Sequence, residues 1–196
     1  KWIAQMIEHY PNQKCLGGGE ESFGYMVGDF VRDKDAVTAA LLACELVTEA
    51  KSNGSSFFNV LLESYEKLGC FQERLVSLVK KGKSGAEEIE SIMDRFRKDP
   101  PKYIEGSPIR FIEDYATAVR TVVHTQEKEM IPLPKANVLI FIAEDGTRVA
   151  ARPSGTEPKI KFYVSVNTNL NSTRDYRTTK NQLDQKMDRI LAELGM

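Results

Sequence analysis

Long apolar runs are scarce in this sequence of 196 residues, and this scarcity narrows the classes of protein to consider. The longest purely apolar stretch, residues 138–143, has the length of a strand and falls far short of the roughly 18 residues that suggest a membrane-spanning helix. The first residues contain neither a long apolar core nor a cleavage site of small residues, so they lack the features of a signal peptide. We therefore expect a cytoplasmic protein without a membrane partner.

The sequence also contains few cysteines, and its positive and negative charges nearly balance. Cys15, Cys44 and Cys70 lie far apart and form neither a C-x-x-C metal motif nor a dense disulfide scaffold, so we expect reduced thiols. The 2 histidines have no partner at ligand spacing, so no metal site is expected. With 27 Lys and Arg against 28 Asp and Glu, the net charge of -1 argues against the broad basic face of a nucleic-acid-binding domain. One small phosphate can still be bound locally.

Helical periodicity dominates the first third of the sequence. It predicts a short amphipathic helix over residues 1–7, a helix from near Asp33 to residue 52, and another helix over residues 56–68. A glycine-rich stretch separates the first two. Because the sequence starts in the middle of an amphipathic helix and without methionine, we expect a fragment of a longer protein. Residues 1–70 are predicted to form part of a mixed α/β domain.

From Phe71 onward the pattern changes to strands between two helices. Ser84 and Glu87 have the spacing of a capping box, which predicts a helix that begins at Ser84. Asp145-Gly146 predicts a tight hairpin turn, and a final helix is expected to end at Gly195. Strands are expected over residues 71–79, 109–112, 138–143, 147–151 and 160–167. The fold class is therefore α+β with two α/β-type units, and residues 71–196 are expected to form a compact α+β domain with an antiparallel sheet and helices on one face.

The segment Arg152-Pro153-Ser154-Gly155-Thr156-Glu157-Pro158 lies between two expected strands. An arginine guanidinium matches phosphate with two parallel charge-assisted hydrogen bonds. Ser154 and Thr156 add hydroxyl donors, and Gly155 lets backbone amides approach an anion. The same residues also suit a polar hairpin loop whose arginine pairs with a surface carboxylate. Residue types alone leave both interpretations open.

The glycine-rich segment Gly19-Glu20-Glu21-Ser22-Phe23-Gly24 carries groups that can hydrogen-bond to sugar hydroxyls. It is neither a Walker A loop nor a dinucleotide fingerprint, and an ordinary acidic turn before a helix has the same composition. In the following segment, Arg32-Asp33-Lys34-Asp35, the acids suit a helix N-terminus. Arg32 and Lys34 are unfavourable there unless they face an anion in a cleft.

Taken in this order, the three segments make the sequence similar to the α-D-phosphohexomutase superfamily, which contains phosphoglucomutases and phosphomannomutases. The resemblance covers nearly the whole chain and corresponds to the end of the family's third domain plus its fourth domain. It implies that Glu20 and Ser22 bind the sugar hydroxyls and that Lys34 and Arg32 lie near the cleft. It also implies that the phosphate that is not being transferred is bound by Arg152, Ser154, Gly155 and Thr156.

The family's phosphoserine loop, of the type Thr-Ala-Ser-His-Asn-Pro, and its magnesium loop, of the type Asp-Gly-Asp-x-Asp-Arg, do not occur in this sequence. The resemblance therefore implies that the catalytic serine and the Mg²⁺ ligands belong to N-terminal domains of the same chain, and that the fragment alone is inactive. The intact enzyme is expected to interconvert hexose 1-phosphate and hexose 6-phosphate through a hexose 1,6-bisphosphate. Glucose is the favoured sugar, with mannose and pentose phosphates as alternatives. The rival hypothesis is a standalone, non-catalytic phosphosugar-binding module.

Overall fold

The computed structural model describes residues 2–20, 24–80 and 82–195. The chain divides into two compact units, Lys1–Leu62 and Glu63–Met196, which are described separately below. None of the helices in the described part of the chain has the length and apolar character that a bilayer crossing requires.

The first unit combines helices with a small hairpin. Its elements are α1 (Trp2–His9), β1 (Gly17–Gly19), β2 (Tyr25–Val27), α2 (Ala36–Ser52) and the first half of α3 (Phe57–Leu68). The strands β1 and β2 pair antiparallel, and Gly18 allows α1 to approach them, because a Cβ at Gly18 would lie 2.8 Å from Cδ1 of Ile3. The Asp35 carboxylate caps α2 by accepting a hydrogen bond of 3.0 Å from the Val37 amide. The helix near Asp33 thus begins at Ala36.

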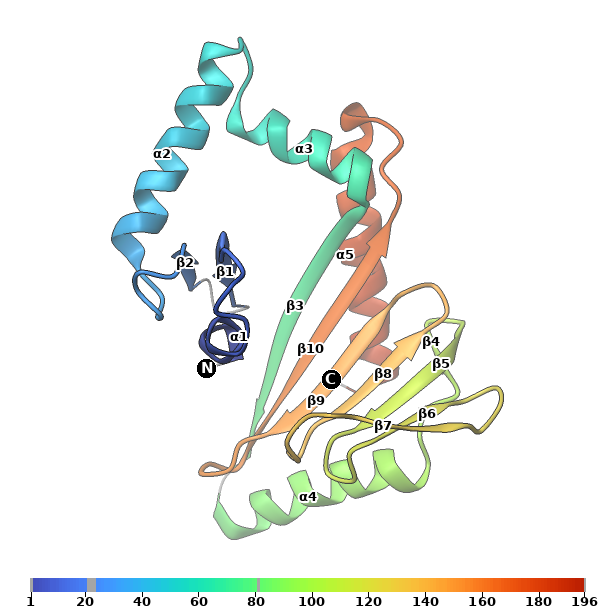
Figure 1. Cartoon of the computed structure of the whole chain (residues 1–196). Coiled ribbons are helices and arrows are strands. Elements are labelled where there is room, and N and C mark those ends of the chain that lie inside the picture. Colours follow the sequence, from blue (N-terminus) through green and yellow to red (C-terminus); the bar gives the residue numbers. More distant parts are fainter. Residues whose placement is uncertain (1, 21–23, 81, 196) are drawn as a thin grey trace. The chain divides into compact units, whose positions relative to one another are not determined.

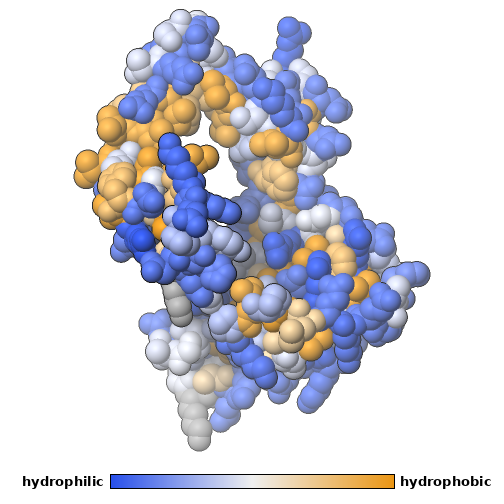
Figure 2. Space-filling view, in the orientation of Figure 1, coloured by the Kyte–Doolittle hydropathy of each residue, from blue (hydrophilic) through white to orange (hydrophobic). Residues whose placement is uncertain are grey.

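The apolar stripe of α2 is exposed. The side chains of Val37 and Leu41 are 79% and 60% exposed, and only Met26, Ala50 and Leu62 are buried among the described residues of this unit. Figure 2 shows the hydrophobic surface that gathers over α2. A helix with such a stripe is normally stabilised by a surface that covers it. The first unit thus combines helices with one small hairpin and leaves the apolar stripe of α2 exposed.

The second unit is built on an antiparallel sheet of 8 strands in the order β3-β10-β9-β8-β5-β6-β7, with β4 paired to β5 (Figure 1). The strands are β3 (Cys70–Val79), β4 (Tyr103–Ile104), β5 (Ser107–Asp114), β6 (Val119–Val122), β7 (Lys128–Met130), β8 (Leu139–Ala143), β9 (Arg148–Pro153) and β10 (Lys159–Thr168). The helical elements are α4 (Gly82–Lys98), η1 (Thr173–Asp175) and α5 (Tyr176–Glu193).

One face of this sheet and both long helices share a single core. Along β10, alternate residues from Ile160 to Val166 are at most 2% exposed, as the strict alternation of the sequence predicted. The buried faces of α4, centred on Met93, and of α5, centred on Met187, belong to the same cluster. The helices therefore cover one face, and the expected α+β class with helices on one face is confirmed.

Two expectations about local structure fail. The helix α4 begins at Gly82, so Ser84 lies within its first turn and the predicted capping box is wrong. The chain turns into α4 directly after β3, and Gly85 packs against the strand end, where a Cβ would lie 2.6 Å from Cβ of Lys80. The strands β4, β6 and β7 were not anticipated, because β4 has only 2 residues, β6 only 4, and the 3 residues of β7 are all exposed.

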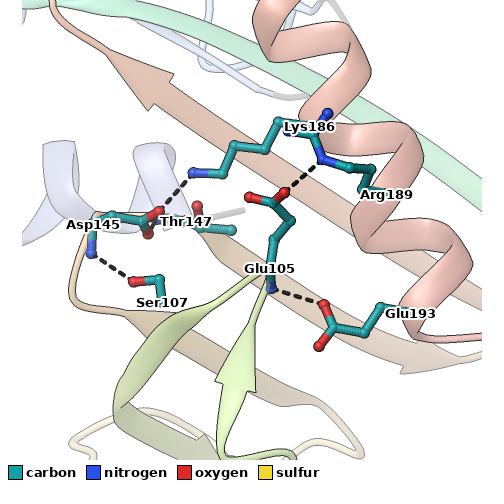
Figure 3. A network of polar contacts seen from close by, with 7 residues as sticks. All are labelled: Glu105, Ser107, Asp145, Thr147, Lys186, Arg189 and Glu193. Carbon is teal, nitrogen blue, oxygen red and sulfur yellow. Dashed lines mark hydrogen bonds and ion pairs between the residues drawn. The ribbon is translucent and has the colours of Figure 1, made fainter.

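A polar network joins the turns of the sheet to α5 (Figure 3). The Asp145 carboxylate accepts hydrogen bonds from Lys186 Nζ at 2.6 Å and from the Thr147 amide at 2.9 Å. In the neighbouring turn, Glu105 accepts a bond of 2.5 Å from Arg189, and its amide donates to the Glu193 carboxylate at 2.7 Å. Partial burial alone would raise the pKa of Asp145, but the hydrogen bonds from Lys186 and Thr147 outweigh it and lower that pKa.

We expect Asp145→Asn to reduce the free energy of unfolding by about 0.5–1 kcal/mol near neutral pH, an amount limited by solvent screening at this partly exposed site. Because the pKa of Asp145 is lowered in the folded state, its contribution is present above the ordinary pKa of 3.8 and is lost as the pH falls through the folded-state value. Denaturant titrations of both proteins should converge as the pH falls below 3.8 and through the lowered folded-state pKa of Asp145. As a control, Asp184→Asn removes a pair on α5 with Lys180 at 2.5 Å and should cost less, about 0.3–0.5 kcal/mol. A constant difference across this pH range would contradict the assignment.

Candidate functional site

Near its C-terminal end, β9 presents Arg152 on the face of the sheet that carries no helix, directly before the loop to β10. Arg152 stands directly opposite Lys161 in the antiparallel register, next to the buried Ala151 and Ile160. The loop is closed by a hydrogen bond of 2.7 Å from the Ser154 amide to the Lys159 carbonyl. Side chains directly opposite on neighbouring strands lie side by side, so the sheet itself holds two cations together at the mouth of this loop.

Ser154 shapes the backbone of the loop. Its Oγ accepts hydrogen bonds from the amides of Thr156 at 3.4 Å and Glu157 at 3.3 Å. Such serine turns fix the backbone locally. Both contacts use the oxygen as an acceptor, so the hydroxyl hydrogen stays available to an anion above the loop.

Neither the backbone conformation nor the neighbouring atoms require glycine at position 155. The φ of Gly155 lies outside the left-handed region, and a Cβ built there would meet nothing within 4 Å. A side chain at this position would therefore extend into open space rather than into a neighbouring part of the protein.

A pocket of about 210 Å³ lies beside this loop. Its lining contains three cationic side chains and the first part of the loop, namely Arg152, Pro153, Ser154, Gly155, Lys159 and Lys161. Thr156 lies outside this pocket and lines an adjoining hollow of about 400 Å³ instead. The structure thus brings together Arg152, Ser154 and Gly155 and places Thr156 at the edge.

Lys159 and Lys161 were missed as candidates from the sequence. The signal was present, because the alternation of β10 that buries Ile160 and Phe162 must direct Lys159 and Lys161 to the opposite face. Lys159 also lies 3.9 Å from the Glu157 carboxylate, a contact that partly offsets its charge. A pocket with three cations and one nearby carboxylate favours an anion, and its small size suits a single phosphate group.

In the first unit, Glu20 and Lys34 approach each other over Gly24. The Lys34 Nζ lies 4.0 Å from Glu20 Oε1, and the Glu20 amide donates to the Gly24 carbonyl at 2.9 Å. A Cβ at Gly24 would lie 2.2 Å from Cδ of Lys34 and 2.5 Å from Oε1 of Glu20, so a larger residue there would displace these two side chains. A hydrogen bond to the Asp33 carboxylate raises the pKa of Lys34, which therefore remains a cation.

The other candidates of this unit are placed differently. Ser22 lies outside the described residues. Arg32 forms an ion pair with Glu8 of α1 and so connects the segment before α2 to the first helix. Glu20 and Lys34 are therefore the two candidates that the structure brings together here.

A magnesium site does not fit the donors that the structure describes. Three or more His, Cys, Asp or Glu side chains are nowhere grouped in residues 2–20, 24–80 and 82–195 as a metal ion would require.

Two family models match the chain. Residues 1–65 match the α/β/α domain III of phosphoglucomutase/phosphomannomutase, and residues 79–169 match the C-terminal domain of the same family. Together they include the loop at Glu20 and the loop at Arg152.

Curated relatives and a solved structure agree with these matches. The chain is 38% identical over 168 residues to a phosphoglucomutase of Staphylococcus haemolyticus and 40% identical over 167 residues to one of Staphylococcus epidermidis; each match covers 85% of the chain. The chain spans only 30% of the length of these relatives. The open form of parafusin, a phosphoglucomutase from Paramecium, covers 98% of the chain with a TM-score of 0.58 at 16% identity, which supports the fold, and the chain spans 33% of it. The chain thus belongs to the phosphoglucomutase/phosphomannomutase family, of which it contains parts of domain III and of the C-terminal domain.

Proposed function

We propose that this chain supplies the sugar-binding and phosphate-binding loops of a phosphohexomutase, an isomerase that interconverts hexose 1-phosphate and hexose 6-phosphate through a hexose 1,6-bisphosphate. The observation that carries the proposal is the pocket in which Arg152, Lys161 and the Ser154 turn converge on a family-matched loop. Within this proposal, residues 1–70 belong to the third domain and residues 71–196 to the fourth.

The phosphate pocket has the properties that a reversible mutase needs. In such a reaction the bisphosphate turns around, so the phosphate that is not transferred comes from either end of the sugar. Arg152 would bind two phosphate oxygens through its guanidinium, and Lys159 and Lys161 would add charge without selecting one sugar orientation. The Ser154 hydroxyl would donate one further hydrogen bond, Gly155 would leave room for the phosphate, and Thr156 would bind at its edge.

The sugar would be recognised through the loop that contains Glu20 and Ser22. The Glu20 carboxylate can accept hydrogen bonds from two neighbouring hydroxyls, and Lys34 supports this role because its ammonium lies 4.0 Å from that carboxylate and helps to orient it. Lys34 would also meet the anionic substrate in the cleft, with Arg32 close by on the same segment. Glucose phosphate is the proposed substrate, and mannose and pentose phosphates are its alternatives.

The phosphoryl transfer itself would depend on N-terminal domains of the parent chain. Such a transfer requires a positioned acceptor and a metal ion that neutralises the developing charge. We propose that these domains hold the phosphoserine and Mg²⁺, and that this chain alone is inactive in the cytoplasm. The alternative, a standalone phosphosugar-binding module, accounts less well for the exposed apolar stripe of α2 and for a length of 30% of the relatives.

A chimeric enzyme tests the proposal. The matching C-terminal part of the Staphylococcus haemolyticus phosphoglucomutase is replaced by this chain, and conversion of glucose 1-phosphate to glucose 6-phosphate is measured. We expect activity in the folded chimera and none in this chain alone. A chimera that is folded by circular dichroism and binds glucose 1,6-bisphosphate, yet has no mutase activity, would contradict the proposal, as would turnover by this chain alone.

A further inference from the structure

The outer edge of β3 offers unpaired backbone groups along a full strand. In the described part of the chain β3 pairs only with β10, which makes it the first strand of the sheet order (Figure 1). The Lys80 amide donates to the Pro158 carbonyl at 2.8 Å and continues the ladder one residue past the Val79–Lys159 pair. Since hydrogen-bonded residues alternate in an antiparallel ladder, the even-numbered residues of β3 bond to β10. The odd-numbered residues direct their N–H and C=O groups outward.

The same odd-numbered residues carry an exposed apolar row. Phe71, Leu75 and Val79 are 48%, 51% and 68% exposed, and they lie on the face of the sheet without helices. Glu73 and Ser77 stand between them. The series is symmetric in its chemistry about Leu75, with an apolar residue at each end and a polar residue at each intermediate position.

Edge strands are usually protected against pairing, and β3 has little of this protection beyond the charge of Glu73. Proteins place lysine, proline, bulges or very short strands at exposed edges. The 10 residues of β3 contain no lysine, proline or glycine, and its register with β10 is regular. By contrast, the other edge strand, β7, has 3 residues and carries Lys128.

We propose that two copies of this chain associate through β3, antiparallel, about a two-fold axis at Leu75. Leu75 then faces Leu75 of the second copy, Phe71 faces Val79, and Glu73 faces Ser77. The outward groups form about ten backbone hydrogen bonds in this register, and the same patch serves both copies, as a two-fold dimer requires. The association does not depend on phosphosugar binding.

The side chains of β3 favour this pairing register over registers that are shifted by one, two or four residues. A shift by two residues places Leu75 opposite either Glu73 or Ser77 and leaves Val79 or Phe71 beyond the paired length. A shift by four residues in the first of these directions brings Glu73 opposite its own copy, and like charges directly opposite destabilise a sheet. Shifts by one residue break the pattern of outward groups, because they pair odd with even positions.

Charge variants at Leu75 test the axis. We expect the unmodified chain to sediment as a dimer at micromolar concentration, whereas Leu75→Lys and Leu75→Glu each sediment as monomers because position 75 faces its own copy. An equimolar mixture of the two variants should restore the dimer, with an affinity at least about 10-fold above that of either variant alone. Met130→Lys, at an 82% exposed residue of the opposite edge strand β7, is the matched control and should remain a dimer.

Circular dichroism shows whether the variants with a charge at position 75 are folded. If they are not, Ser77→Pro tests the same interface. Ser77→Pro removes one outward N–H and leaves the ladder with β10 intact, so it should also give a folded monomer. Monomeric unmodified chain would overturn the proposal. So would a dimer that survives Ser77→Pro or both Leu75 variants, or folded Lys and Glu variants that do not associate when mixed.

Discussion

Arg152→Ala is expected to weaken binding of glucose 1,6-bisphosphate to this chain by about 30-fold. The guanidinium would contribute two charge-assisted hydrogen bonds to one phosphate, and loss of both costs about 2 kcal/mol once solvent screening is considered. Lys159 and Lys161 line the same pocket and retain part of the affinity. Isothermal titration calorimetry measures the difference directly.

The matched control for this change is Arg148→Ala. Arg148 belongs to the same strand β9 and the same face of the sheet, but its guanidinium lies 3.8 Å from the Glu113 carboxylate and does not line the pocket. We expect its removal to leave the affinity within about 2-fold of the unmodified chain, because a distant exposed charge is screened by salt. Equal losses in both variants would show that Arg152 acts only through the general charge of the face.

Phe162→Ala is expected to destabilise the second unit by about 3–5 kcal/mol. Phe162 is 2% exposed and packs edge-to-face on Phe96 of α4 with ring centroids 6.3 Å apart. Its removal therefore leaves a cavity between the sheet and the helix as well as lost apolar contact. Guanidinium denaturation followed by circular dichroism should show the loss as a lower transition midpoint.

Tyr163→Ala serves as the comparison for Phe162. The two residues are neighbours on β10, but Tyr163 points to the face without helices and is only partly buried. We expect about 1 kcal/mol for this change, which removes strand propensity and cross-strand contact without opening the core. If Tyr163→Ala cost as much as Phe162→Ala, the assignment of the two faces would be wrong.

The sequence predicted the fold of the second unit best in segments where apolar and polar residues alternate over a whole strand. Ile160, Phe162, Val164 and Val166 alternate over a full strand, and an alternation of this length by itself indicates which face is buried. The helix start at Gly82 was not predictable from the capping box, because Gly85 packs on Lys80 through a contact between elements that no local rule contains. Short strands such as Lys128–Met130 form because a neighbour pairs with them, not because their own residues alternate.

In the candidate site, too, some features could be predicted from the sequence and others depend on contacts between elements. The residues of the Arg152 loop were predicted to bind phosphate through the family resemblance, because their types alone also suit a polar hairpin loop. Their arrangement around one pocket rests on the register between β9 and β10. Lys161 joined the site only through this register, as the residue opposite Arg152. Arg32 illustrates the reverse case, because its ion pair with Glu8 depends on how α1 folds back on the segment before α2.

The most direct test of the central claim is a titration of the isotopically labelled chain with glucose 1,6-bisphosphate, followed by amide NMR. We predict saturable shifts at the amides of Ser154, Gly155 and Thr156, saturation of these shifts only at about 30-fold higher ligand concentration in Arg152→Ala, and unchanged shifts in Arg148→Ala. Shifts that bypass this loop, or that persist unchanged in Arg152→Ala, would contradict the assignment of the β9–β10 loop as the phosphate site.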